Sequence, residues 1–180
     1  MIRPAWSVAT MDDLKLKIEL VPEPLWGCSL RSDHALGRKR WRTLRKRVLD
    51  DRGAACAVCG SSAGTPHLHE RWSYTERPKT GIAKLVGLEV ICDLCHRVHH
   101  FGQTKQLNQE RTLSDAGLAA VKRHFGSVNK GCEVDLNAHY AAALAEWRVR
   151  SSKSWRVDYG AFAAMVEEAI DSRERRRGQD

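Results

Sequence analysis

Two pairs of closely spaced cysteines place the strongest constraint on what this chain of 180 residues can fold into. Cys56 and Cys59 form one Cys-x-x-Cys pair, and Cys92 and Cys95 form the other. Thiolates three positions apart can bind one ion from a tight turn, and two such turns complete a tetrahedral zinc site. The 32 residues between the pairs are more than a simple zinc ribbon needs. We therefore expect a structural zinc site with a further element inserted between its halves.

The composition predicts a globular protein of the cytoplasm. Hydrophobic residues make up 42% of the chain, which is enough to form a core. There is no apolar run of membrane-spanning length and no secretory signal, so we expect no membrane partner. Because thiols stay reduced in the cytoplasm, six cysteines there indicate metal binding before disulfides. Cys28 and Cys132 belong to no pair, and we expect both to be buried as small apolar residues.

Basic charge is concentrated in the first part of the chain. The net charge is +8, and residues 1–104 hold 17 basic against 11 acidic side chains. The densest run lies in residues 37–53, where Trp41, Leu44 and Val48 recur at helical spacing and Gly53 follows as a stop. This pattern predicts a helix that either presents a solvated basic face or binds nucleic-acid phosphates. The candidate phosphate-binding residues are Arg38, Lys39, Arg42, Arg45 and Lys46.

The flanking regions predict a strand before this helix and several helices at the end of the chain. Residues 14–21 alternate apolar and mostly charged side chains, which is typical of a half-buried strand. After residue 104, apolar stripes at helical spacing predict a helical region, and the basic tail 173–177 is expected to be a frayed end. The chain is thus divided into an N-terminal strand and connector (1–36), a core with its basic entry helix (37–104) and a C-terminal helical region (105–180).

Five of the eight histidines lie between positions 67 and 100, and they form two groups. If the first group lies on a strand, His67 and His69 share one face, with Glu70 on the other. In the second group, His96 and His100 are four residues apart. On a helix they share a face and can bind one metal ion, with His99 as the second choice.

This order of motifs resembles the HNH endonucleases of the ββα-metal type that carry a zinc-binding knuckle pair. The resemblance lies in Cys-x-x-Cys, then His-Glu at the end of a strand, then Cys-x-x-Cys-His-x-x-x-His, within about residues 53–102. The segments around His69 and Cys95 are most similar to a bacterial subgroup of that family. The resemblance implies an α+β fold, in which a two-stranded hairpin and a helix surround a catalytic metal ion.

The resemblance also implies a role for each histidine and a cofactor for each cluster. His69 would be the general base, with Glu70 beside it in the catalytic site. His96 and His100 would bind the catalytic metal, with His67 or Glu70 as a third ligand. The cofactors would be a structural Zn²⁺ on the four cysteines and one catalytic divalent ion: Mg²⁺, Mn²⁺, Ni²⁺ or Zn²⁺. The substrate would be DNA, bound mainly through its phosphates.

Two positions depart from the pattern of the family and favour other hypotheses. Leu68 stands where many members have a metal ligand, and Gly87 stands where many have an asparagine that braces the catalytic loop. The alternative is therefore a non-catalytic zinc-knuckle module that binds nucleic acid or protein. A third hypothesis is a structural zinc protein in which the histidines only pack.

Overall fold

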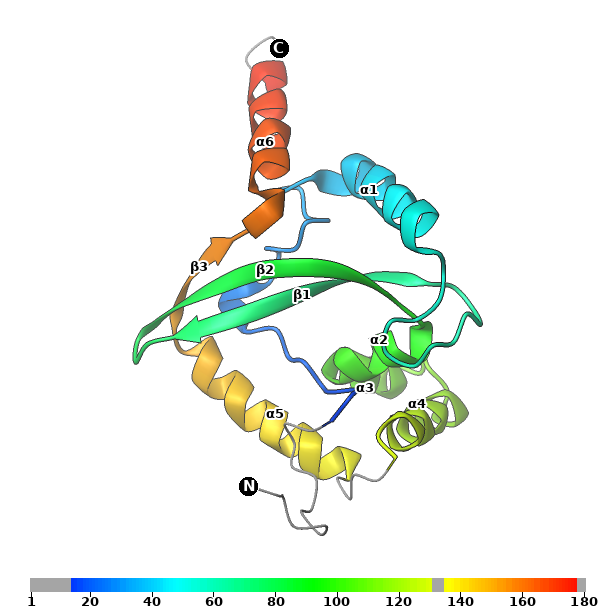
Figure 1. Cartoon of the computed structure of the whole chain (residues 1–180). Coiled ribbons are helices and arrows are strands. Elements are labelled where there is room, and N and C mark those ends of the chain that lie inside the picture. The colour runs from blue at the N-terminus through cyan, green and yellow to red at the C-terminus, as the bar shows by residue number, and fades with distance from the viewer. Residues whose placement is uncertain (1–13, 131–134, 178–180) are drawn as a thin grey trace, which may run out of the picture. The chain divides into compact units, whose positions relative to one another are not determined.

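The computed structural model describes residues 14–130 and 135–177, and this part of the chain has a mixed α+β fold. Three strands form one sheet in the order β1-β2-β3, and six α-helices accompany it within the described residues (Figure 1). The strands are β1 (His67–Glu76), β2 (Thr80–Ile91) and β3 (Ser154–Asp158). The helices are α1 (Gly37–Arg52), α2 (Asp93–His99), α3 (Phe101–Gln109), α4 (Asp115–Val128), α5 (Leu136–Ser151) and α6 (Ala163–Arg177), with short 3-10 helices η2 (Glu23–Leu25) and η3 (Gly160–Phe162).

The chain divides into two compact units, each assembled from separate segments. The first contains the described residues of Met1–Leu20, Cys56–His67 and Ile91–Trp147, and the second contains Val21–Ala55, Leu68–Val90 and the described residues of Arg148–Asp180. No helix within the described ranges is long and apolar enough to cross a membrane. Cys132 lies outside the described residues.

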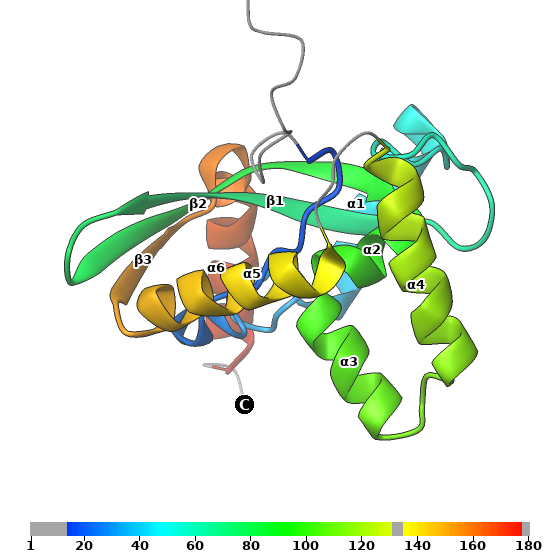
Figure 2. The same ribbon diagram turned by 90° about the horizontal axis from the view of Figure 1, so that it is seen from below.

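The first unit packs α2, α3, α4 and most of α5 around one hydrophobic core (Figure 2). Val121 and Phe125 of α4 are buried there and Leu118 packs against them, so the helix predicted from their spacing is confirmed. Ser114 begins α4 by accepting a hydrogen bond from the N–H of Gly117 at 3.1 Å. This core also contains three of the paired cysteines, which ties the cysteine cluster to the packing of α4.

The strand expected at residues 14–21 is wrong, although its buried face is right. Leu14, Leu16 and Ile18 are buried as the alternation predicts, but the segment has no strand conformation. Its backbone is paired with side chains instead: the N–H of Leu16 donates to Oδ1 of Asn129 at 3.0 Å, and the N–H of Ile18 donates to Nε2 of His139 at 2.8 Å. Periodicity predicts which side chains are buried but not what satisfies the backbone between them.

His139 makes the attachment of this N-terminal segment sensitive to pH. Burial, and then the positive charge of Lys17, lower the pKa of His139 below its ordinary value. The folded state therefore favours the neutral ring, whose Nε2 can accept from Ile18. That stabilisation is present above the unfolded-state pKa of about 6.5 and is lost as pH falls below it. We expect the free energy of unfolding by urea, at saturating zinc, to fall more steeply between about pH 7.5 and 5.5 in the parent than in His139→Gln. Equal pH dependence in the two chains would contradict the prediction.

The second unit is built on the β1–β2 hairpin, with β3 added beside β2 (Figure 1). Strand β3 runs parallel to β2, with Gly81 opposite Trp155. A side chain at Gly81 would collide with the Trp155 ring, so a glycine is needed where this ring crosses β2. The C-terminal region that is predicted to be helical therefore also contains a short strand, β3.

Helix α1 confirms the helix predicted from the basic run. It spans Gly37–Arg52, and Gly53 ends it at φ 76°, a conformation that glycine adopts most easily. Trp41, Leu44 and Val48 pack against the core of the second unit, which also contains Val166 and Ala169 of α6. The basic side chains of α1 are thereby left on its other faces.

Candidate functional site

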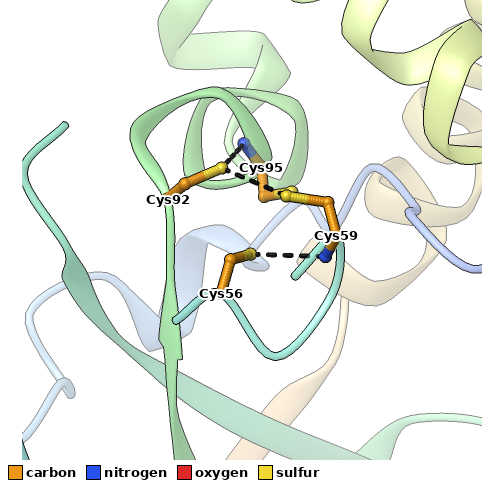
Figure 3. Close-up of side chains that lie close together, drawn as sticks. All are labelled: Cys56, Cys59, Cys92 and Cys95. Atoms are coloured by element: carbon orange, nitrogen blue, oxygen red, sulfur yellow. Dashed lines mark hydrogen bonds between the residues drawn. The ribbon is translucent and has the colours of Figure 1, made fainter. Parts of the chain in front are cut away.

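The four paired cysteines form one cluster in the first unit, as their spacing predicts. Their sulfur atoms all lie within 4.8 Å of one another (Figure 3). Cys56, Cys92 and Cys95 are buried, and Cys59 is partly exposed. Four soft sulfur donors at this separation can bind a single metal ion, and such a donor set is typical of structural zinc sites.

Local backbone turns aim each sulfur at the others. In the first pair, the N–H of Cys59 points to Sγ of Cys56 at 3.5 Å, and the N–H of Gly60 donates to the carbonyl of Cys56 at 2.8 Å. In the second pair, Cys92 is the N-cap of α2, and the N–H of Cys95 points to its sulfur at 3.5 Å. Each Cys-x-x-Cys pair therefore provides a sulfur and an amide that favours the charged form of that sulfur.

The electrostatics of the cluster also favour a bound cation. Burial raises the pKa of Cys56, but donors including the N–H groups of Cys59 and Cys92 outweigh it and bring the pKa to about 7. Burial raises the pKa of Cys92. The pKa of Cys95 is raised strongly by burial and then by repulsion from Cys56 and Cys92. Four neighbouring thiolates are compatible only with a positive charge among them, so the residues fit a divalent metal ion.

Three of the predicted histidines gather at α2 in the same unit. The rings of His67 and His96 are stacked with centroids 4.4 Å apart, and the rings of His96 and His100 lie 4.6 Å apart. Oδ1 of Asp93 lies 3.3 Å from Nε2 of His67, and the other carboxylate oxygen accepts from Nε of Arg97 at 2.6 Å. Three histidines from two elements are thus in ring contact beside the carboxylate of Asp93.

His100, and not His99, is the histidine that lies against His96. Helix α2 ends at His99, but the N–H of His100 still donates to the carbonyl of His96 at 3.0 Å. This bond has helical spacing, so it continues the last turn of the helix to His100. The side chain of His99 is buried, and its Nδ1 lies 3.7 Å from a carboxylate oxygen of Glu19. Of the two candidates, His100 is therefore the one whose ring contacts His96.

His69 and Glu70 lie on β1 in the second unit. His69 is 5% exposed. Glu70 accepts hydrogen bonds at both carboxylate oxygens, from the N–H of Leu30 at 2.9 Å and from Nε1 of Trp72 at 3.1 Å. Burial raises the pKa of Glu70. These bonds fasten the hairpin to the connector around Leu30.

The two positions that depart from the family pattern are both part of the hairpin. Leu68 is buried in the core of the second unit, where it packs with Leu85 and Val90 among others. Gly87 lies within β2, and a β-carbon built there would have no neighbour within 4 Å. Leu68 therefore has a packing role, and the place of Gly87 has room for a side chain.

The candidate phosphate-binding residues form an exposed surface along α1. Four of them are exposed and Arg45 is partly buried; the exposed four are Arg38, Lys39, Arg42 and Lys46. Nζ of Lys46 lies 2.6 Å from Oδ2 of Asp50, near the end of the helix where acidic residues begin.

Helix α6 contacts the segment just before α1 through an arginine, a contact that no local pattern predicts. The helix continues through the tail that is expected to fray, and Nη2 of Arg173 donates to the carbonyl of Ala35 at 2.6 Å. That carbonyl lies two residues before α1 begins, so α1 and the basic end of α6 meet within the second unit.

Comparison of the chain with protein-family models, with curated proteins and with solved structures found no match. The function is therefore inferred from the residues themselves.

Proposed function

We propose that this protein is a metal-dependent DNA endonuclease of the HNH type. The observation that carries the proposal is the cluster of His67, His96 and His100 at α2. This helix directly follows the β1–β2 hairpin and begins at the second cysteine pair. The order of hairpin, cysteine pair and histidine-bearing helix is what the resemblance to HNH enzymes implies. The closed Cys₄ site would hold zinc and stabilise the start of α2, and the histidines would bind the catalytic ion.

His69 is proposed as the general base. Strand β1 begins at His67, so His69 lies two residues further along on the same face of the strand. The Cα atoms of two residues at this spacing are about 7 Å apart. A neutral imidazole at this position can accept a proton from the attacking water. A divalent ion on His96, His100 and His67 would stabilise the negative charge that develops on the phosphate and its leaving oxygen.

The surface of α1 and the end of α6 is proposed to bind the phosphates of DNA. Its exposed arginines and lysines can contact a duplex backbone without reading sequence. Trp72 and Tyr74 are engaged within the hairpin unit, in edge-to-face contacts with Tyr159 and Trp155, so we assign them packing roles and not base stacking.

The test is cleavage of supercoiled plasmid by the zinc-loaded full chain, with and without Mg²⁺, Mn²⁺, Ni²⁺ or added Zn²⁺. We expect nicking that requires one of these ions, together with a metal content of two ions per chain under cleavage conditions. Absence of nicking with every ion would overturn the proposal.

The second candidate is a zinc-knuckle module that binds nucleic acid without cutting it. The buried Leu68 and the bare position at Gly87 favour it, since a catalytic HNH site usually has functional side chains at both. This candidate predicts one ion per chain and salt-sensitive DNA binding without cleavage.

A further inference from the structure

A histidine outside both predicted clusters touches the cysteine cluster. Nε2 of His124 lies 3.2 Å from Sγ of Cys95, although the two residues are 29 positions apart in sequence. Cys95 belongs to α2 and His124 to α4, and these helices lie side by side in both views of the molecule (Figures 1 and 2). Both belong to the first unit.

The packing of α4 fixes the direction of this ring. Val121 and Phe125, on either side of His124 along the helix, are 0% and 2% exposed in the core that also contains Cys95. His124 itself is only partly buried. Its ring therefore lies at the edge of the core, held against the sulfur by its buried neighbours.

The neighbours of the sulfurs show what this ring adds. The sulfurs of Cys56 and Cys92 each face the N–H of the second cysteine of their own pair. Cys95 is the second cysteine of its pair, and its sulfur is fully buried against His124. A metal-bound thiolate accepts hydrogen bonds and donates none. Beside such a sulfur, Nε2 of His124 must carry its hydrogen.

We propose that His124 is a positioning residue of the Cys₄ metal centre, which donates Nε2–H to the metal-bound sulfur of Cys95. This bond spreads part of the charge of the thiolate and opposes its release from the metal. It also fastens α4 to the metal centre, so that metal retention and the docking of α4 support each other. Hydrogen-bond partners of ligands typically change metal affinity about 10- to 100-fold when removed. This role requires the metal on the cysteines and is independent of nuclease activity.

The experiment measures zinc transfer from the full chain to a chromogenic chelator, and the absorption spectrum after substitution with Co²⁺. His124→Ala removes the donor, His124→Gln keeps a side-chain N–H, and His34→Ala is the control at an exposed histidine of the second unit. We expect His124→Ala to release zinc about 10- to 100-fold faster than the parent, His124→Gln to recover most of the loss, and His34→Ala to match the parent.

The spectrum separates a hydrogen-bonding role for His124 from a role as a metal ligand. All four chains should show the tetrahedral four-sulfur Co²⁺ spectrum, because His124 does not bind the metal directly. Zinc release from His124→Ala at the parental rate would overturn the proposal. A spectral change confined to the His124 variants would also overturn it, because it would show that His124 is a ligand. If His124→Ala and His124→Gln release zinc equally fast, and faster than the parent, with unchanged circular dichroism, the result would contradict the proposal that a donated hydrogen bond slows zinc release.

Discussion

Replacing Cys59 with serine is expected to remove the metal from the Cys₄ site and to unfold the first unit. Binding of structural zinc contributes about 10–16 kcal/mol in zinc-finger peptides. Whole domains are stable by only about 5–15 kcal/mol. Three of the four ligands are also part of the core on which α4 packs, so losing the metal leaves raised-pKa thiols buried among apolar side chains. The unit should not survive that loss.

The measurements are zinc content per chain, far-ultraviolet circular dichroism and limited proteolysis. Cys28→Ser is the matched control, because Cys28 is a partly buried cysteine of the second unit outside the cluster. We expect Cys59→Ser to lose about one zinc per chain and much of its helical signal, and Cys28→Ser to keep both. A Cys59→Ser chain that holds zinc as the parent does would contradict the assignment of the four ligands.

The features that the sequence predicts correctly are those decided within a few residues. A Cys-x-x-Cys pair forms its own turn, so the spacing of Cys92 and Cys95 already indicates that both sulfurs point to one place. The spacing of His96 and His100 works in the same way through one turn of backbone. Helix α1 is predictable because its apolar stripe and its glycine stop are both local signals.

The features that the sequence does not predict depend on contacts between distant segments. Residues 14–20 have the pattern of a strand, yet Asn129 and His139 from remote segments satisfy their backbone. Strand β3 is five residues long and depends on a glycine far away in β2 to make room for Trp155. His124 has no neighbouring metal ligand in sequence, and only the docking of α4 brings it to Cys95.

Replacing His69 with alanine is expected to slow cleavage strongly while leaving DNA binding intact. General-base catalysis typically contributes about 10²–10⁴-fold, and plasmid nicking should slow by that factor. Because His69 is buried, His69→Gln is needed beside His69→Ala as a variant of similar volume. Both should keep the parental circular dichroism, zinc content and DNA affinity. Nicking at the parental rate in either folded variant would contradict the assignment of the base.

A variant of α1 is expected to weaken DNA binding while leaving the chemical step intact, which separates binding from catalysis. Arg38→Gln/Arg42→Gln/Lys46→Gln removes exposed charges that lie outside both metal clusters. If each side chain neutralises one phosphate, the slope of log affinity against log salt should become shallower by about 0.9 for each phosphate that is no longer neutralised. Cleavage by this variant should recover at low salt and high protein concentration, because its base and metal ligands are intact. Cleavage by the His69 variants should not recover under any salt condition. These variants bind the substrate but lack the group that accepts the proton.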